Sequence, residues 1–287
     1  MTSAPSREDQ QKRKPDFVAP ALTCDAHCHV FGPGASFPYA PNRRYTPKDA
    51  PREALAALHE RLGIKRAVIV QASCHGTDNR AMLDAIAWRP DRYRGVAIVD
   101  DSFDDKALQA LHDGGVRGVR FNFVKHLGGA PDMVVFDRVI ERIKGRGWHV
   151  VLHLDAVDIV PLSDMIRRLP IPFVIDHMGR VDTSLGIEQP AFRSLLDLAR
   201  RDDCWVKVCG SERISAYPFD AALPFARALV EASPERTLWG TDFPHPNLKD
   251  PVDEADLLDL VPRIVPDVEG QRRLLVENPA RLYGFTT

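Results

Sequence analysis

Short β-rich runs alternate with longer segments of helical periodicity along most of this chain. The β-rich runs lie at 25–29, 67–71, 96–99, 118–122, 149–154, 173–176, 205–209 and 237–240. The helical segments lie at 52–62, 78–88, 104–112, 133–144, 158–169, 188–201, 220–232 and 271–277. Many of the helical segments carry apolar residues three and four apart, as Leu55, Leu58 and Leu62 do. Strand and helix alternation implies parallel strands joined by right-handed crossovers.

Eight such units predict an α/β fold, a single (β/α)8 barrel of the TIM type. The alternative is a doubly wound open sheet, but no GxGxxG follows the first strand to indicate a dinucleotide site. The 287 residues fit one barrel domain of roughly 250 residues. We assign the barrel to 21–287. Residues 1–20 are rich in Ser, Gln, Lys and Pro and predict a mobile polar tail without a catalytic role.

The composition gives no sign of a nucleic-acid or membrane partner. Lys and Arg number 38 against 40 Asp and Glu, so the net charge is −2 and any anion must be recognised locally. Five cysteines without paired CxxC spacing indicate a reducing compartment. We see neither an apolar signal-peptide core nor a segment long enough to cross a bilayer. These features predict a cytoplasmic protein, while its oligomeric state stays open.

The first strand carries a His-x-His pair, His27 and His29. Alternate residues of a strand point to the same face, so the two imidazoles are able to meet at one centre. Gly32, Pro33 and Gly34 then end the strand, which leaves His29 near its carboxyl end. Taken alone, this motif is a weak signal of a metal site or of a reacting carbonyl.

Further polar residues fall at the carboxyl ends of other predicted strands, where (β/α)8 barrels carry their active sites. They are Ser73 and His75 after strand two, Arg120 and Asn122 on strand four, His153 on strand five, His177 and Arg180 after strand six, Arg213 after strand seven and Asp242 after strand eight. Any one of them is readily explained as a packed or capping residue. Their convergence at one rim indicates a functional site.

Closure of the barrel places strand eight beside strand one, so we expect Asp242 next to His27 and His29. Imidazole and carboxylate ligands together suit Zn²⁺, and a catalytic zinc keeps one position open for water. His153 and His177 would reach toward the same point from strands five and six.

Several long blocks of this sequence resemble the 2-pyrone-4,6-dicarboxylate lactonase branch of the amidohydrolase superfamily. They are DAHCHVFG at 25–32, QASCHGTDN at 71–79, RGVRFNF at 117–123, DHMGR at 176–180, WGTDFPHPN at 239–247 and NPARLY at 278–283. The resemblance implies a distorted (β/α)8 barrel that opens anionic lactones by hydrolysis. It further implies that His27, His29 and His177 surround the lactone carbonyl and that Asp242 handles the proton of the attacking water. The side chains implied to hold the acid groups of the substrate are Tyr45, Ser73, Arg120, Arg180 and Arg213.

Two positions depart from the pattern of the dicarboxylate lactonases. His153 stands where those enzymes have a tyrosine, and His126 stands where they have an arginine. Metal-dependent members of the superfamily have a histidine at the end of strand five, whereas the dicarboxylate branch is understood to work without metal. His126 replaces a guanidinium fork, the best planar partner of a carboxylate. Both departures favour the neighbouring activity of this branch, 4-sulfomuconolactone hydrolysis, which is associated with zinc.

We therefore expect a hydrolase of bacterial aromatic-compound degradation that opens a 4-sulfomuconolactone-type ring. In this hypothesis Zn²⁺ is held by His27, His29, His153 and Asp242, and His126 joins the residues that bind the substrate. Asp242 carries the water proton, and His177 stabilises the oxyanion. Three alternatives remain: a metal-free 2-pyrone-4,6-dicarboxylate lactonase, a metal-dependent decarboxylase of the same superfamily, and a non-catalytic binding protein for small anions. Release of carbon dioxide would reveal the decarboxylase.

Overall fold

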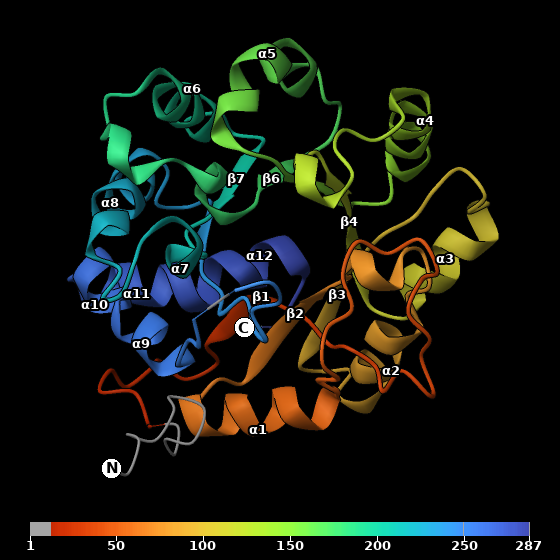
Figure 1. The fold of residues 1–287 in the computed structure, drawn as a ribbon, viewed down its shortest axis with the longest axis horizontal. Helices are drawn as coiled ribbons and strands as arrows, with labels where there is room; N and C mark the ends of the chain where they lie inside the picture. The colour runs from red at the N-terminus through yellow and green to blue at the C-terminus, as the bar shows by residue number, and fades with distance from the viewer. Residues whose placement is uncertain (1–12, 249, 287) are drawn as a thin grey trace, which may run out of the picture.

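Eight parallel strands form one sheet in which each strand pairs with the next along the chain (Figure 1). The computed structural model describes residues 13–248 and 250–286. The strands are β1 Cys24–Cys28, β2 Arg66–Val70, β3 Tyr93–Ala97, β4 Val116–Asn122, β5 His149–His153, β6 Phe173–Ile175, β7 Cys204–Lys207 and β8 Thr237–Leu238. Helices surround the strands in Figure 1. The predicted (β/α)8 barrel is confirmed.

The helices lie between the strands or follow β8. They are α1 Arg52–Leu62, α2 Arg80–Trp88, α3 Asp105–Asp113, α4 Met133–Ile143, α5 Ala156–Arg167, α6 Pro190–Ala199, α7 Ser211–Ile214, α8 Leu223–Ala232, α9 Glu254–Asp259, α10 Val261–Ile264, α11 Val268–Arg272 and α12 Asn278–Tyr283. The sequence did not predict α7, α9, α10 or α12, because segments of four to six residues are too short to show a helical period. None of the helices within the described ranges is both long and apolar enough to span a bilayer.

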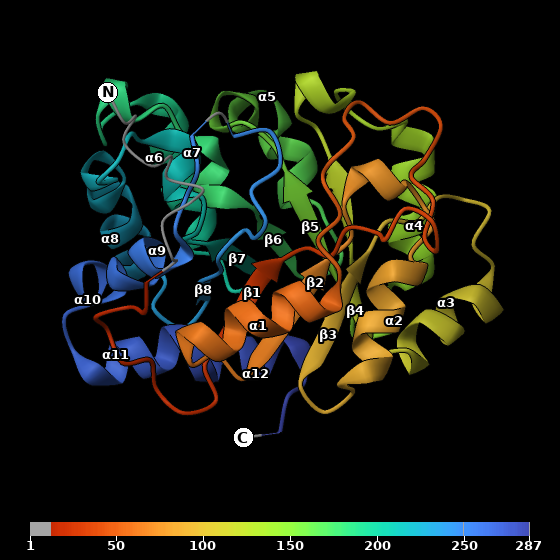
Figure 2. The same ribbon diagram turned by 60° about the horizontal axis from the view of Figure 1, so that its bottom comes forward.

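The barrel interior is filled by alternate residues of the strands. Side chains two apart on a strand share a face, and in a barrel one face of every strand points inward. Val68 of β2, Val151 of β5 and Val174 of β6 belong to one such buried cluster. Tyr283 of α12 belongs to the same cluster. In Figure 2, α12 lies across one end of the barrel. The loops that follow β1 and β8 lie at the opposite end. The helix therefore closes one end and leaves the other for the candidate site.

Backbone hydrogen bonds join β1 to the segment that follows β8. The amide of Ala26 donates to the carbonyl of Trp239 over 2.9 Å, and the amide of Asp242 donates to the carbonyl of His27 over 2.8 Å. The buried carboxylate of Asp25 reinforces this junction by accepting hydrogen bonds from the amide and hydroxyl of Thr241. The barrel closes here, at β1, which carries His27 and is followed by His29.

The long segment between β1 and α1 is tied to the barrel by His75, which follows β2. Its Nδ1–H donates to the carbonyl of Pro38 over 3.2 Å, and its Nε2 accepts from the amide of Gly32, also over 3.2 Å. The ring of Tyr39 lies 4.7 Å from the imidazole, centroid to centroid. His75 therefore holds this segment in place, and both its ring nitrogens are engaged.

The predicted N-terminal tail, 1–20, lies partly outside the described residues, which begin at Arg13. Within its described part, the amide of Arg13 donates to Asp253 over 3.1 Å, and the amide of Phe17 donates to Asp259 over 2.8 Å. The guanidinium of Arg13 also pairs with Asp256. Residues 13–17 thus contact α9 and the residue before it.

The closed junction makes a prediction about Gly240. A Cβ at this position would lie 2.5 Å from the amide nitrogen of His27 and 2.8 Å from its Cβ, so β1 would have to move. We expect Gly240→Ala to lower the free energy of unfolding by about 1–3 kcal/mol, the usual cost of overpacking. Urea denaturation measures this change. Gly34→Ala is the control, because Gly34 does not have a positive φ and a Cβ there would come no closer than 3.3 Å to its nearest neighbour, a ring atom of Tyr39; an equal loss in both variants would contradict the steric explanation.

Candidate active site

Asp242 lies at the centre of a group of imidazoles. Its Oδ1 is 3.6 Å from Nε2 of His27, 3.4 Å from Nε2 of His29 and 3.9 Å from Nε2 of His177. The backbone of Asp242 has a φ of 59°, in the left-handed region that a residue other than glycine seldom adopts. Such strain is typical of functional sites, and here it accompanies a carboxylate facing residues of β1 and the segment after β6.

The second oxygen of Asp242, Oδ2, accepts a hydrogen bond from Nε of Arg213. Burial alone would raise the pKa of this carboxyl. The positive charge of Arg213 and the nearby imidazoles outweigh burial and hold the pKa of Asp242 well below its usual range. Asp242 is therefore ionised at neutral pH, and its Oδ1 is buried without a hydrogen-bond partner among the described residues.

Behind His27 lies a buried group of charges. Nδ1 of His27 is 3.2 Å from Oδ1 of Asp176 and 2.9 Å from Nζ of Lys207. Lys207 and Asp176 are 3.1 Å apart and fully buried, and Nε of Arg120 donates to the other oxygen of Asp176 over 2.9 Å. Burial opposes the ionisation of Asp176, but Lys207 and its other neighbours keep the pKa of Asp176 well below normal.

His29 has a defined tautomer. Its Nδ1 is 2.7 Å from the carbonyl oxygen of Val70, and a carbonyl oxygen only accepts hydrogen bonds. The proton therefore lies on Nδ1. The lone pair of Nε2 faces Asp242, so this pair of atoms is able to accept the protons of a water molecule or to bind a cation.

His177 begins a left-handed turn after β6. The φ angles of His177, Met178, Gly179 and Arg180 are 51°, 53°, 62° and 47°. Three of these residues carry a Cβ and are strained in this conformation. The turn directs the imidazole of His177 toward β1, with its centroid 4.5 Å from that of His27.

His153, the predicted fourth zinc ligand, lies at the end of β5 with its ring centroid 5.4 Å from that of His177. Both its ring nitrogens are buried and lack a hydrogen-bond partner in the part of the chain described. Burial lowers the pKa of His153 well below its usual value, so the ring is neutral. The structure places His153 beside the site. Among the described residues, however, His153 is not part of any group of ligand atoms close enough together to share one ion.

His27, His29 and Asp242 form a possible metal site, because their ligand atoms lie within 4.8 Å of one another. Ligand atoms about 2.1 Å from a tetrahedral zinc are about 3.4 Å apart. The separations between Asp242 and the two histidines, 3.4 and 3.6 Å, match this spacing. Nε2 of His27 and Oδ1 of Asp242 are also buried atoms without a partner among the described residues. These three residues therefore fit a divalent ion.

Three arginines border the group, and each is oriented by a carboxylate that accepts from its Nε. The arginines are Arg120, Arg180 and Arg213, and their acceptors are Asp176, Asp155 and Asp242. Among the described residues, no hydrogen-bond acceptor engages their terminal nitrogens. A guanidinium held in this way presents its outer edge to an anion.

The other predicted substrate-binding residues lie near these arginines. The hydroxyl of Tyr45 is within hydrogen-bonding reach of Ser73, and burial raises the pKa of Tyr45 despite the nearby charge of Arg120. His126 is exposed. Incomplete hydration and the positive charges of Arg180 and Arg213 lower the pKa of His126. The structure thus surrounds the histidine group with basic and hydroxyl side chains.

Sequence reasoning did not assign a role to Lys207 or Cys209. A signal for both exists in the sequence, because residues 205, 207 and 209 share one face of the predicted strand and Trp205 belongs to the barrel interior. Strand periodicity therefore places an ammonium and a thiol inside the barrel. Their partners, His27 and His177, lie 180 and 32 residues away along the chain, and the sequence does not reveal such distant pairs.

The chain is similar to known hydrolases over nearly its whole length. The model of the amidohydrolase family matches residues 24–285. A 2-pyrone-4,6-dicarboxylate hydrolase of Comamonas testosteroni is 49% identical, over 94% of this chain and 92% of that protein. A 4-sulfomuconolactone hydrolase of Rhizobium radiobacter is 43% identical, over 93% of this chain and 92% of that protein. A solved structure from Acinetobacter baumannii with bound citric acid has a TM-score of 0.81 and 29% identity, and the match covers 92% of this chain and 100% of that one.

Proposed function

The chain belongs to the amidohydrolase family, and from this premise we propose that it opens the ring of a small anionic lactone by hydrolysis. The observation that carries the proposal is the single carboxylate oxygen of Asp242, which three imidazoles face within 4 Å. A site of this kind provides a base for water and donors for a carbonyl oxygen. The lactone hydrolases at 49% and 43% identity support this reaction class.

In the proposed reaction, Asp242 and His29 position the attacking water. Both present lone pairs to the same point, and Asp242 accepts the proton as the water oxygen bonds to the carbonyl carbon. The electron pair of the carbonyl moves onto its oxygen. When the ring C–O bond breaks, the oxyanion reforms the carbonyl and Asp242 returns the proton to the leaving oxygen, so a hydroxyl group and a carboxylic acid are formed. The acid then loses its remaining water-derived proton to solvent and becomes a carboxylate.

His177 would stabilise the negative charge that develops on the carbonyl oxygen. Its neutral ring lies beside His27, and its Nε2 faces the same oxygen of Asp242 that Nε2 of His29 faces, so the carbonyl and the water would be held among these imidazoles. Burial keeps the pKa of His177 well below normal. The ring therefore acts as a hydrogen-bond donor and is not a cation.

The arginines would orient the substrate through its acid groups. Arg120, Arg180 and Arg213 each have a guanidinium edge available, and Tyr45, Ser73 and His126 complete the set. The related Acinetobacter structure contains citrate, a small molecule with several carboxylates, which is consistent with anion binding by this fold.

We propose a lactone of the 4-sulfomuconolactone type, which carries a sulfonate and a carboxylate. His126 supports this choice, because an exposed imidazole of lowered pKa is a weaker partner for a second carboxylate than a guanidinium. Rates of ring opening of 4-sulfomuconolactone and of 2-pyrone-4,6-dicarboxylate, measured side by side, test it. A higher kcat/KM on the dicarboxylate would reverse the choice.

We propose Zn²⁺ as the metal, held by His27, His29 and Asp242, with His153 beside them. When bound, such an ion lowers the pKa of a coordinated water toward about 7. Asp176 would then accept the Nδ1–H of His27 over the observed 3.2 Å and leave Nε2 free as a ligand.

One observation favours a second candidate, lactone hydrolysis without metal. Nζ of Lys207 lies 2.9 Å from Nδ1 of His27 and, as an ammonium, only donates. If Nδ1 accepts this bond, the proton of His27 lies on Nε2, which then donates to the substrate and does not bind an ion. The tautomer of His27 therefore separates the two candidates.

We also propose that the enzyme is cytosolic and acts in aromatic-compound degradation. All five cysteines are free thiols and buried, which suits a reducing compartment. Fractionation of the native host, with assay of ring opening in the cytosolic fraction, tests this placement.

Asp242→Asn should lower kcat by roughly 10²–10⁴-fold, because an amide does not accept the water proton. Substrate affinity, measured by calorimetry, should stay within a few-fold, since the arginines remain. Asp105→Asn is the control, because that side chain is exposed. Near-normal turnover by Asp242→Asn would remove this residue as the proton carrier.

Metal analysis of the purified protein should find about one zinc per chain, and chelation should remove both zinc and activity until zinc is restored. His29→Asn should fail to retain the ion. Full activity without metal would instead support the second candidate. Lys207→Met then serves as a matched test. If Lys207 fixes the tautomer of His27, this variant should lower metal-free turnover. If Asp176 fixes that tautomer, the variant should still bind zinc.

Arg180→Met should raise KM for a dianionic lactone by roughly 10–100-fold, the scale of a lost charge-assisted hydrogen bond, and should change kcat little. Arg213→Met should lower kcat as well, because its Nε holds Asp242. An uncharged lactone is the control substrate. Equal losses on charged and uncharged lactones would show that Arg180 does not bind an acid group.

A further inference from the structure

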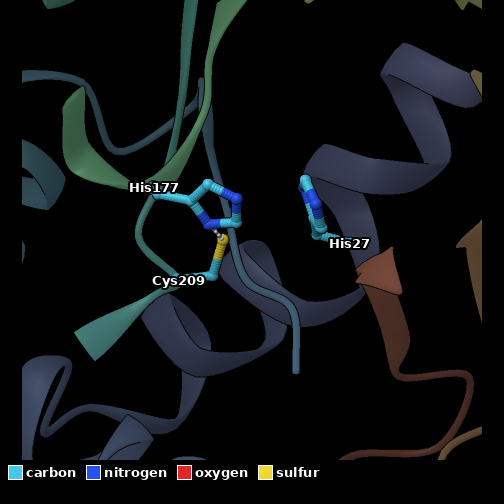
Figure 3. A group of neighbouring side chains, drawn as sticks. All are labelled: His27, His177 and Cys209. Atoms are coloured by element: carbon cyan, nitrogen blue, oxygen red, sulfur yellow. Dashed lines mark hydrogen bonds between the residues drawn. The ribbon is translucent and has the colours of Figure 1, made fainter. Parts of the chain in front are cut away.

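Cys209, the second residue after β7, contacts the imidazole of His177 from behind. Its Sγ is 3.3 Å from Nδ1 of His177, and the thiol is almost fully buried. Figure 3 shows the sulfur of Cys209 directed at a ring nitrogen of His177 from below, while His27 lies to the right of the same ring. This contact is distinct from the one between His177 and Asp242, which involves Nε2.

The backbone next to Cys209 follows the ring of His177 closely. A Cβ on Gly210 would lie 3.0 Å from both Cβ and Nδ1 of His177, and Gly210 has a φ of 80°. Only glycine combines this conformation with such a close approach. The imidazole is therefore held between the segment after β7 and the residues of β1, with little room to turn over.

The two contacts together place the proton of the ring. At His29 a carbonyl oxygen holds the proton on Nδ1, but Nδ1 of His177 meets a thiol, so the negative charge of Asp242, whose Oδ1 lies 3.9 Å from Nε2 of His177, decides the position of the proton. The proton is favoured on Nε2, and Nδ1 is then an acceptor. The thiol S–H of Cys209 is the donor that meets it. Burial raises the pKa of Cys209 well above normal, so this thiol keeps its proton and is no nucleophile.

We propose that Cys209 is a positioning residue that fixes His177 as the Nε2–H tautomer, with this N–H directed at the carbonyl oxygen of the lactone. The inference deepens the proposed hydrolysis and rests on it. As water adds to the carbonyl carbon, the carbonyl electron pair moves to the oxygen, and the Nε2–H donates a hydrogen bond to that oxygen without losing its proton. Cys209 itself does not touch the substrate.

The tautomer is measured directly in the purified protein labelled with ¹⁵N-histidine. Long-range ¹H–¹⁵N correlations report which ring nitrogen carries the proton, and the loss of one signal set in His177→Gln identifies the residue. We expect His177 to be neutral, with the proton on Nε2. A proton on Nδ1 would overturn the inference, whether or not any Cys209 variant folds.

Three variants test the consequence for turnover. Cys209→Ala should lower kcat by roughly 10–100-fold with KM nearly unchanged, the usual scale for loss of a partner that orients a functional histidine. Cys209→Ser keeps a donor and should retain most of the activity and the same tautomer. Cys204→Ala is the matched control, because that buried thiol lies at the start of β7 and contacts the carbonyl of Trp205. Thermal unfolding confirms that each variant is folded.

The outcomes separate this inference from the proposed function. If the wild type opens neither lactone, the proposed function fails, while the tautomer measurement still decides the role of Cys209. If the wild type is active and Cys209→Ala matches it in kcat, the positioning role fails and the hydrolysis stands. If alanine and serine lower kcat equally, the thiol acts through packing, which also overturns the inference.

Discussion

Three backbone hydrogen bonds between β1 and the segment after β8 determine the site. They join Ala26 to Trp239, Asp242 to His27 and His29 to Phe243, over 2.8–2.9 Å. The two bonds at His27 and His29 put the backbone of Asp242 and its neighbour against the histidine pair, so the side chains meet at the open end of the barrel. The junction requires that residue 240 has no Cβ. Closure of the barrel and assembly of the candidate site are therefore one structural event.

Strand periodicity and the order of strands in a closed barrel were enough to predict the fold and the meeting of His27, His29 and Asp242. In such a barrel the last strand lies beside the first, so residues more than 200 positions apart were expected to be neighbours. The same logic brought His177, Arg180 and Arg213 to the rim. Three of the short helices after β8, namely α9, α10 and α12, escaped prediction, because they contain too few residues to show a period.

The partners of the rim residues were not predictable in the same way. His75 sits at the rim by sequence, yet both its nitrogens hold the segment after β1. His153 lies beside His177 and outside the group that fits an ion. These outcomes depend on backbone conformations, such as the left-handed turn after β6, and on which buried acceptor comes within about 3 Å. A one-dimensional pattern does not contain this information.

The histidines of the site show how one residue type acquires different roles from its surroundings. Nδ1 of His29 meets a carbonyl oxygen, so its Nε2 is an acceptor. Nδ1 of His177 meets a thiol, so its Nε2 is a donor. Nδ1 of His27 lies between a carboxylate and an ammonium, which favour opposite tautomers. A reaction that activates water on one side and stabilises an oxyanion on the other needs both kinds of nitrogen, and the atoms behind each ring decide which kind it presents.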